Sequence, residues 1–230
     1  MVRLEVIATS LEDALLAEEG GADRIELVRD LHEGGLTPDM DLAAQIARAV
    51  SIPVHVMIRP HSKSFHMNEA DIRTMLNDSK RAYQAGVSAL VWGVLTERGT
   101  IHRDALETLL AAAPLPVTFH RAFDEIEQQE EALGVLLAYE QIRSVLTSGG
   151  AASALHAADR LKVLVALTAG HSLQVMAGAG LTLASLQDFV QAVPVPVVHL
   201  GTGVRRNGRM DEPVDASKVR EAKSILQSLA

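Results

Sequence analysis

The chain has 230 residues, of which 48% are hydrophobic and 3% aromatic, and its formal net charge is −8. Because cysteine is absent, disulfide scaffolds, thiolate zinc sites, iron–sulfur clusters and cysteine nucleophiles are excluded. The acidic balance argues against a nucleic-acid partner, and no apolar run approaches the roughly 20 residues that a membrane-spanning helix needs.

Short β-branched runs alternate with longer helical patterns along the whole chain. The runs predict strands at 4–8, 24–28, 53–59, 89–95, 116–122, 144–148, 173–178 and 195–201. The helical patterns lie at 11–19, 39–50, 68–85, 103–113, 127–140, 152–167, 182–193 and 215–228. Thr37 is predicted to cap the second helix ahead of Pro38, and Asn68 to cap the third. No linker divides the chain, so residues 1–230 are expected to form a single domain.

Eight alternating strands and helices fit either a (β/α)8 barrel or a doubly wound open sheet. Within several strands, however, polar residues alternate with apolar ones. An open sheet would bury both faces under helices, where unpaired charges are costly. In a barrel the apolar face meets the helices and the polar face lines the interior. The sequence therefore predicts a single-domain (β/α)8 TIM barrel, with Glu5 and Glu26 pairing with Arg24 and Arg59 inside it.

The predicted interior polar residues have two interpretations. They can form a purely structural network that fixes the core. Alternatively, they can be catalytic, because Arg59 and His120 come late in their strands, at the end of the barrel where active sites lie. A histidine beside carboxylates can transfer protons near neutral pH, and arginine binds carboxylate or phosphate. The candidate acid–base set is Glu5, Glu26, Arg59, His120 and Asp124.

Two glycine-containing loops follow the seventh and eighth predicted strands. Gly178 and Gly180 lie in the first loop, and Gly201 and Gly203 in the second. Loops at these positions form the recurrent phosphate site of barrel enzymes, and glycine lets an anion approach the backbone closely. Ser148 is a candidate hydrogen-bond donor to the same substrate. The alternative is that these glycines serve only as tight turns.

Six segments in order resemble the CutC family. They are GADRIEL (21–27), EGGLTP (33–38), MIRP (57–60), TFHRAFD (118–124), VLTSG (145–149) and MAGAG (176–180). The resemblance extends from about residue 4 to residue 199. It implies a TIM barrel, a role in copper homeostasis, a cytoplasmic location and assembly into a homodimer or higher homo-oligomer.

The copper role suggested by the resemblance requires ligands other than cysteine. Cu(I) prefers thiolates and thioethers, whereas Cu(II) accepts imidazole and carboxylate. The candidate copper ligands are therefore Met57, Met176 and His199, whose side chains are predicted to face the barrel axis.

Two functional hypotheses follow. In the first, the protein acts in copper homeostasis and binds copper, its candidate cofactor. In the second, it is a barrel enzyme that carries out acid–base chemistry on a small anionic or phosphorylated metabolite. The partner is accordingly a metal ion or a small anionic ligand, without nucleic acid or membrane. The first twenty residues enter an acidic amphipathic stretch at once, which predicts a cytoplasmic protein.

Overall fold

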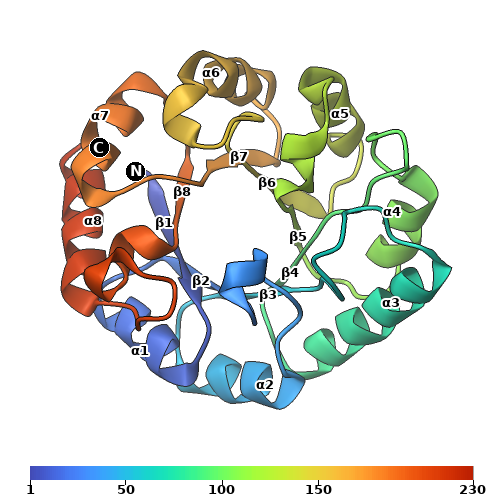
Figure 1. Ribbon diagram of the computed structural model, residues 1–230, viewed down its shortest axis with the longest axis horizontal. Helices are drawn as coiled ribbons and strands as arrows, with labels where there is room; N and C mark the ends of the chain where they lie inside the picture. The colour runs from blue at the N-terminus through green and yellow to red at the C-terminus, as the bar shows by residue number, and fades with distance from the viewer. Residues whose placement is uncertain (230) are drawn as a thin grey trace.

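The computed structural model describes residues 1–229, in which eight parallel strands close into a barrel in chain order (Figure 1). The strands are β1 (Arg3–Ala8), β2 (Arg24–Leu27), β3 (Val54–Met57), β4 (Ala89–Trp92), β5 (Val117–Phe119), β6 (Ile142–Thr147), β7 (Gln174–Ala177) and β8 (Val197–Leu200). The helices around the barrel are α1 (Leu11–Glu19), α2 (Met40–Ala49), α3 (Glu69–Gln84), α4 (Arg103–Leu110), α5 (Gln129–Leu136), α6 (Ala158–Leu167), α7 (Leu183–Ala192) and α8 (Ala216–Ser228). Because β1 also pairs with β8, the sheet has no open edge, and the predicted (β/α)8 barrel is confirmed.

Short 3₁₀ helices occupy several loops at which the sequence predicted strand, helix or no regular structure. They are η1 (Leu31–Glu33), η2 (Arg121–Glu125), η3 (Ala154–His156), η4 (Thr202–Val204) and η5 (Arg206–Gly208). The fifth strand was predicted to reach residue 122 but ends at Phe119. It ends there because the His120 ring accepts a hydrogen bond from the backbone N–H of Ala122, which turns the chain into η2.

The helix caps were predicted correctly at Asn68 and wrongly at Thr37. Asn68 forms a capping box with Asp71 at the start of α3. The cap of α2 is instead Asp39, whose carboxylate accepts hydrogen bonds from the first-turn N–H groups. The Thr37 hydroxyl accepts the backbone N–H of Arg59 at 2.8 Å. Thr37 therefore fixes the chain just after β3, where the barrel opens.

Apolar and polar residues alternate along the strands, which separates the apolar layer beneath the helices from the polar interior of the barrel. Leu4 and Val6 of β1 are fully buried in the apolar layer that packs against the helices. Glu5, on the opposite face, is also fully buried, and its register partners are Arg24 on β2 and His199 on β8. In a parallel barrel, such register partners project inward side by side. The strand register therefore brings charges of opposite sign together inside the barrel.

Candidate functional site

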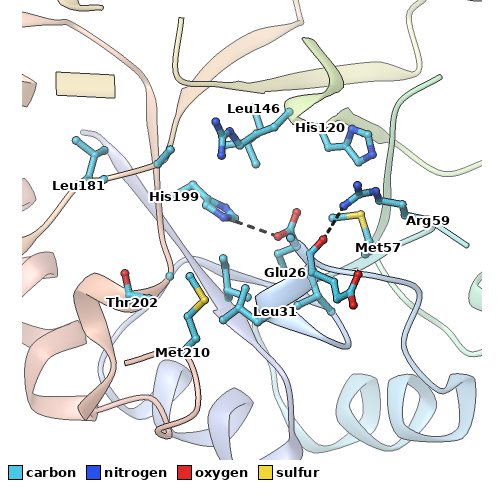
Figure 2. A pocket seen from close by; sticks show the side chains of 18 of the residues that line it. Glu26, Leu31, Met57, Arg59, His120, Leu146, Leu181, His199, Thr202 and Met210 are labelled. Carbon is cyan, nitrogen blue, oxygen red and sulfur yellow. Dashed lines mark hydrogen bonds and ion pairs between the residues drawn. The ribbon is translucent and has the colours of Figure 1, made fainter. Parts of the chain in front are cut away.

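A cavity of about 440 Å³ lies at the C-terminal ends of the strands (Figure 2). Its titratable lining residues are Glu26, Glu33, Arg59, His120, Arg121 and His199. Its apolar lining residues include Ile7, Val28, Leu31, Met57, Leu146 and Met210. A concave, largely apolar cavity with a few convergent polar groups is the usual form of a small-molecule site. It also lies at the end of the barrel where TIM-barrel enzymes bind substrate.

Below the cavity, Glu5 is the centre of a fully buried ionic network. Arg24 Nε lies 2.5 Å from one of its carboxylate oxygens, and His199 Nδ1 lies 2.7 Å from the other. Burial opposes ionisation of Glu5, but Arg24 and His199 together hold its pKa well below the ordinary value. His55 lies 3.5 Å from the same carboxylate, and burial lowers its pKa to about 4. Glu5 is therefore an anion that orients its neighbours.

Glu26 forms the floor of the cavity and is incompletely paired. Its Oε2 lies 3.7 Å from His199 Nε2, whereas its buried Oε1 has no hydrogen-bond partner among residues 1–229. Figure 2 shows the Glu26 carboxyl group in the middle of the site, beside His199. Burial raises the pKa of Glu26 to about 7, the nearby charge of Glu5 adds to the rise, and His199 opposes it. A carboxyl with this pKa exchanges protons at neutral pH.

His199 connects the two carboxylates. Because ionised Glu5 only accepts hydrogen bonds, the His199 Nδ1 at 2.7 Å carries a proton and its Nε2 faces Glu26. Burial lowers the pKa of His199, but Glu26 and Glu5 outweigh burial and raise it above the ordinary value. The strand order explains this arrangement, since β8, β1 and β2 are neighbours in the barrel. The three side chains therefore form one proton-sharing unit.

Arg59 lines one wall of the cavity, and its predicted ion pair with Glu26 is not formed. Its Nη1 donates to the backbone carbonyls of Glu33 at 3.2 Å and Gly35 at 3.4 Å. The ring of Phe65 covers the guanidinium, with 4.5 Å between Arg59 Cζ and the ring centroid. The pairing fails because Arg59 lies two residues beyond β3, where the loop after β2 reaches its guanidinium first.

His120 lies beside Arg59 with its tautomer fixed by the backbone. The N–H of Ala122 donates to His120 Nδ1 at 3.2 Å, so a neutral ring carries its proton on Nε2. Burial, and then the charge of Arg59, lower the pKa of His120 to about 3. The ring fits because position 93 is glycine, where a Cβ would lie 2.7 Å from Nδ1. His120 is therefore a neutral hydrogen-bond donor at physiological pH.

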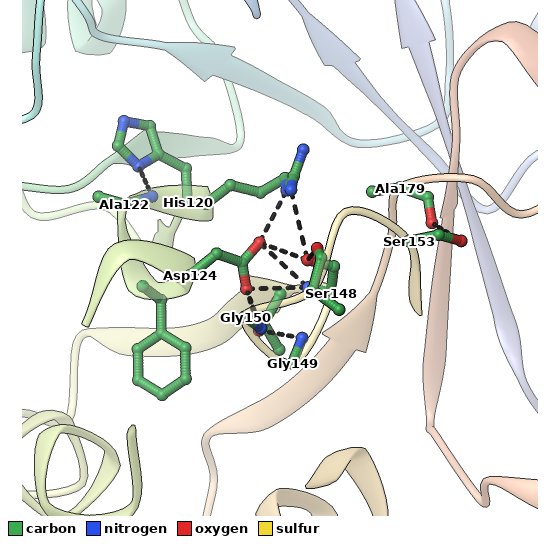
Figure 3. A network of polar contacts seen from close by, with 12 residues as sticks. His120, Ala122, Asp124, Ser148, Gly149, Gly150, Ser153 and Ala179 are labelled. Carbon is green, nitrogen blue, oxygen red and sulfur yellow. Dashed lines mark hydrogen bonds and ion pairs between the residues drawn. The ribbon is translucent and has the colours of Figure 1, made fainter. Parts of the chain in front are cut away.

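Asp124 and Ser148 lie behind the cavity wall in a network of polar contacts (Figure 3). The Asp124 carboxylate accepts hydrogen bonds from the Ser148 hydroxyl at 2.9 Å, the Ser148 N–H at 3.0 Å and the Gly150 N–H at 3.2 Å. It also accepts the Nε–H of Arg121 at 2.8 Å. Asp124 does not line the cavity, whereas Arg121 does. The network therefore links η2 to the loop after β6 and orients Arg121 at the cavity wall.

The four glycines after β7 and β8 differ in their surroundings. Gly180 and Gly201 line the cavity. Gly178 and Gly203 do not. A Cβ would lie 2.7 Å from a neighbouring atom at Gly178 or Gly203, and still closer to Ser153 Oγ at Gly180, so close packing requires glycine at all three positions. In the loop after β7, the backbone N–H groups of residues 179–181 donate no hydrogen bond within residues 1–229. These free donors lie at the cavity, just before α7.

The three predicted copper ligands lie in different surroundings. Met57 lines the cavity within one small apolar cluster, whereas Met176 lies in another and contacts Arg24 through its sulfur at 3.1 Å. The group with ligand atoms within 4.8 Å of one another consists of Glu5, Glu26 and His199. Only His199 is shared between the predicted set and this cluster.

Three residues that shape the cavity wall were not among the predicted site residues, although Thr37 was predicted as a helix cap. Phe65 covers both Arg59 and His120, with 4.9 Å between its ring centroid and that of His120. Gly93 provides the space for His120, and Thr37 holds the backbone of Arg59. The one local signal in the sequence was Gly93, directly after β4, because glycine is disfavoured inside a strand and marks a close approach of another group. The contacts themselves join segments far apart in the chain.

Comparison with known proteins identifies the family. The CutC family profile matches residues 2–204. A copper homeostasis protein cutC homolog of Homo sapiens is 40% identical over 208 residues, covering 90% of this chain and 76% of the human protein. The chain belongs to the CutC family. A CutC family protein of Salmonella typhimurium is 41% identical over 206 residues, covering 89% of this chain and 81% of that protein.

Solved structures agree with this assignment. The crystal structure of CutC from Streptococcus agalactiae superposes with a TM-score of 0.81 at 31% identity, covering 87% of this chain and 98% of that one. Phosphoribosyl anthranilate isomerase of Thermotoga maritima has a TM-score of 0.65 at 13% identity, covering 99% and 100% of the two chains, which shows a shared fold alone. Within residues 1–229, no helix of this CutC protein has the length and apolar character to cross a membrane.

Proposed function

We propose that this CutC protein is an enzyme in which Glu26 transfers a proton to or from a small anionic substrate at the C-terminal mouth of the barrel. The observation that carries the proposal is the Glu26 carboxyl. It is 2% exposed, lines the cavity, has one buried oxygen without a hydrogen-bond partner within residues 1–229, and has a pKa of about 7. Structural carboxylates in protein interiors are normally fully hydrogen-bonded. A buried carboxyl with a free oxygen and a neutral pKa matches the needs of a general acid or base.

The neighbours of Glu26 support this role by fixing its charge environment. Glu5 is held ionised by Arg24 and keeps a proton on His199 Nδ1. The raised pKa of His199 favours the doubly protonated ring, whose Nε2–H, 3.7 Å from Glu26, then stabilises the carboxylate when Glu26 has given up its proton. For His120, predicted to take part in proton transfer, we favour a hydrogen-bonding role, because its low pKa keeps it neutral. It is suited to donate a hydrogen bond from Nε2.

Anion recognition is supported by two kinds of donor. Arg59 and Arg121 line the cavity, and Asp124 orients Arg121 by accepting its Nε–H at 2.8 Å. The free N–H groups of residues 179–181 precede the N-terminus of α7, whose dipole favours an anion. An anionic substrate would thus be held at the rim while Glu26 acts from the floor.

Exchange of substrate hydrogen with solvent tests the proposal and needs no assay for a particular product. A panel of small phosphorylated and carboxylated metabolites is incubated with the protein in D₂O, and loss of C–H signals is followed by ¹H NMR. We expect exchange with at least one compound and a loss of about 10²–10⁴-fold in rate for Glu26→Gln. Glu97→Gln, at an exposed site away from the cavity, is the matched control. Exchange at the wild-type rate in Glu26→Gln would overturn the role of Glu26.

Direct copper binding is a second candidate, favoured by the cluster of Glu5, Glu26 and His199. Its oxygen and nitrogen donors suit Cu(II) and not Cu(I), which prefers sulfur. Arg24 already pairs with Glu5 at 2.5 Å and would repel a cation there, which is why the enzyme proposal is preferred. Chelator competition tests the candidate. Submicromolar Cu(II) binding that is lost in His199→Gln supports it, and binding that survives this change removes the cluster.

The sulfur ligands are tested separately with Cu(I). Loss of Cu(I) binding in Met57→Leu or Met176→Leu would support the methionines, and unchanged binding would exclude them. The cytoplasmic location and the homo-oligomeric state implied by the CutC resemblance stay predictions. Cell fractionation tests the location, and light scattering coupled to size-exclusion chromatography tests the oligomeric state.

A further inference from the structure

Arg59 is a buried cation without an anionic partner. Its residue is 6% exposed, and no carboxylate within residues 1–229 comes within 4.0 Å of its guanidinium nitrogens. The other two buried arginines each have one, since Arg24 pairs with Glu5 and Arg205 with Asp13. Buried charges are normally paired, because desolvation otherwise makes them costly. Glu33 and Glu125 act favourably on the charge of Arg59 from a distance, but neither pairs with it directly, which leaves its guanidinium able to take an anion from outside the protein.

The contacts of Arg59 leave one edge of its guanidinium free. Nη1 is used by two backbone carbonyls, and the ring of Phe65 covers the planar face. Nε is buried without any acceptor, and Nη2 donates no hydrogen bond within residues 1–229. Nε and Nη2 together form the side of the guanidinium that binds both oxygens of a carboxylate. This edge has the geometry to pair with a planar carboxylate, which would reach the buried Nε once the cavity wall around it opens.

His120 adds a second unsatisfied donor beneath the same aromatic ring. Its Nδ1 accepts the N–H of Ala122, so its proton is on Nε2, which is buried and has no acceptor. Phe65 contacts both His120 and Arg59. Two neighbouring donors that both lack an acceptor are rare in a folded interior. One oxygen-bearing anion entering beside Phe65 would satisfy both.

The free backbone N–H groups of residues 179–181 lie on the other side of the cavity. Figure 2 shows Leu181 on one side, Arg59 and His120 on the opposite side, and Glu26 and His199 between them. Figure 3 likewise separates Ala179 from His120, with Ser148 between them. β3 and β7, which lead to the two sites, are separated by three strands around the barrel.

We infer that the substrate is a small phosphorylated carboxylic acid, whose carboxylate pairs with Arg59 and His120 and whose phosphate lies on the loop after β7. The inference rests on the proposed function, because it takes the phosphate loop and the central Glu26 from it. It adds the second acidic group and fixes the orientation of the molecule. The carbon chain between the two groups then passes over the Glu26 carboxyl, so protons on that chain are the ones that exchange.

Matched pairs of phosphates test the carboxylate subsite by isothermal titration calorimetry. The pairs are 3-phosphoglycerate with glycerol 3-phosphate, and 6-phosphogluconate with sorbitol 6-phosphate. Within each pair only the first compound has a carboxylate, and the two pairs differ in chain length. In the wild type we expect the acid of at least one pair to bind tenfold or more tightly than its partner, as a charge-assisted bidentate contact implies. Arg59→Gln should abolish this preference. Arg59→Lys keeps the charge but lacks the two parallel N–H donors of the guanidinium, so it should retain only a small part of the preference.

The outcomes separate this inference from the proposed function. In both variants, glycerol 3-phosphate, which has no carboxylate, should lose far less affinity than the acid does. Urea denaturation of both variants shows whether loss of the loop contacts of Arg59 has affected folding. Arg73→Gln on the exposed face of α3 is the control. Equal binding within both pairs, or equal loss of both members in the Arg59 variants, would overturn the carboxylate subsite alone. If neither inorganic phosphate nor any of the four compounds binds the wild type, the anion pocket of the proposed function fails as well.

Discussion

The Glu26 carboxyl should make the protein less stable as the pH rises from 5 to 8. In the folded protein burial raises its pKa from 4.5 to about 7. In the unfolded chain Glu26 gives up its proton near pH 4.5, so between these values the folded state binds more protons and stability falls with pH. A shift of this size gives a loss of about 2.5 kcal/mol between pH 5 and 8. Above the folded-state pKa the loss is complete and the curve levels off.

Urea denaturation at pH 5, 6, 7 and 8 measures this effect. Glu26→Gln removes the titrating group with little change in shape, so the stability of the wild type relative to the variant should fall by about 2.5 kcal/mol across the range. The difference also includes the effect of Glu26 on His199, whose pKa it raises. Glu97→Gln should run parallel to the wild type. Parallel curves for the wild type and Glu26→Gln would refute the raised pKa and with it the acid–base role.

Three further substitutions test the framework of the site. Asp124→Asn should lower the free energy of unfolding by about 1–3 kcal/mol, because the part-buried N–H and hydroxyl of Ser148 lose a charged acceptor, and it should also weaken phosphate binding. Gly93→Ala should cost about 1–3 kcal/mol, because a Cβ would lie 2.7 Å from the His120 ring. Asp13→Asn should cost about 3–5 kcal/mol, because Arg205, 2.9 Å away, becomes an unpaired buried charge.

Each of these three predictions has its own contradicting result. Wild-type phosphate affinity in Asp124→Asn would show that Arg121 needs no anchor or does not bind the anion. An unchanged melting temperature in Gly93→Ala would mean that the His120 ring can move away from position 93. That result would contradict the tautomer assigned from its hydrogen bond with Ala122. Stability within 1 kcal/mol of the wild type in Asp13→Asn would show that the Arg205 pair contributes little to holding the loop after β8.

The barrel itself follows from local sequence patterns. Strands and helices alternate, and the polar residues of the strands fall on one face, so a closed sheet with a polar interior is the arrangement that avoids burying charges against helices. Parallel neighbours in register also bring Glu5 beside Arg24 and His199. These features depend on periodicity and on strand order, both of which can be predicted from the chain.

The boundaries after the strands were less predictable because side chains decide them. His120 ends β5 through a hydrogen bond to Ala122, although the residues themselves favour a longer strand. Thr37, which the sequence makes a good helix cap, accepts a hydrogen bond from Arg59 instead. In both cases a contact formed in the folded protein outweighs the local preference.

The sequence by itself determined that carboxylates, arginines and histidines line the inside of a (β/α)8 barrel, because their phase within the strands is a local property. Only the tertiary structure decided how they pair. The height of each residue in the barrel gives Glu5 two partners, leaves Glu26 with a free oxygen, and keeps Arg59 from reaching a carboxylate. Burial, which depends on the whole fold, then raises the pKa of Glu26 to about 7. The chemistry of the site follows from these unpaired groups, which no spacing in the sequence can reveal.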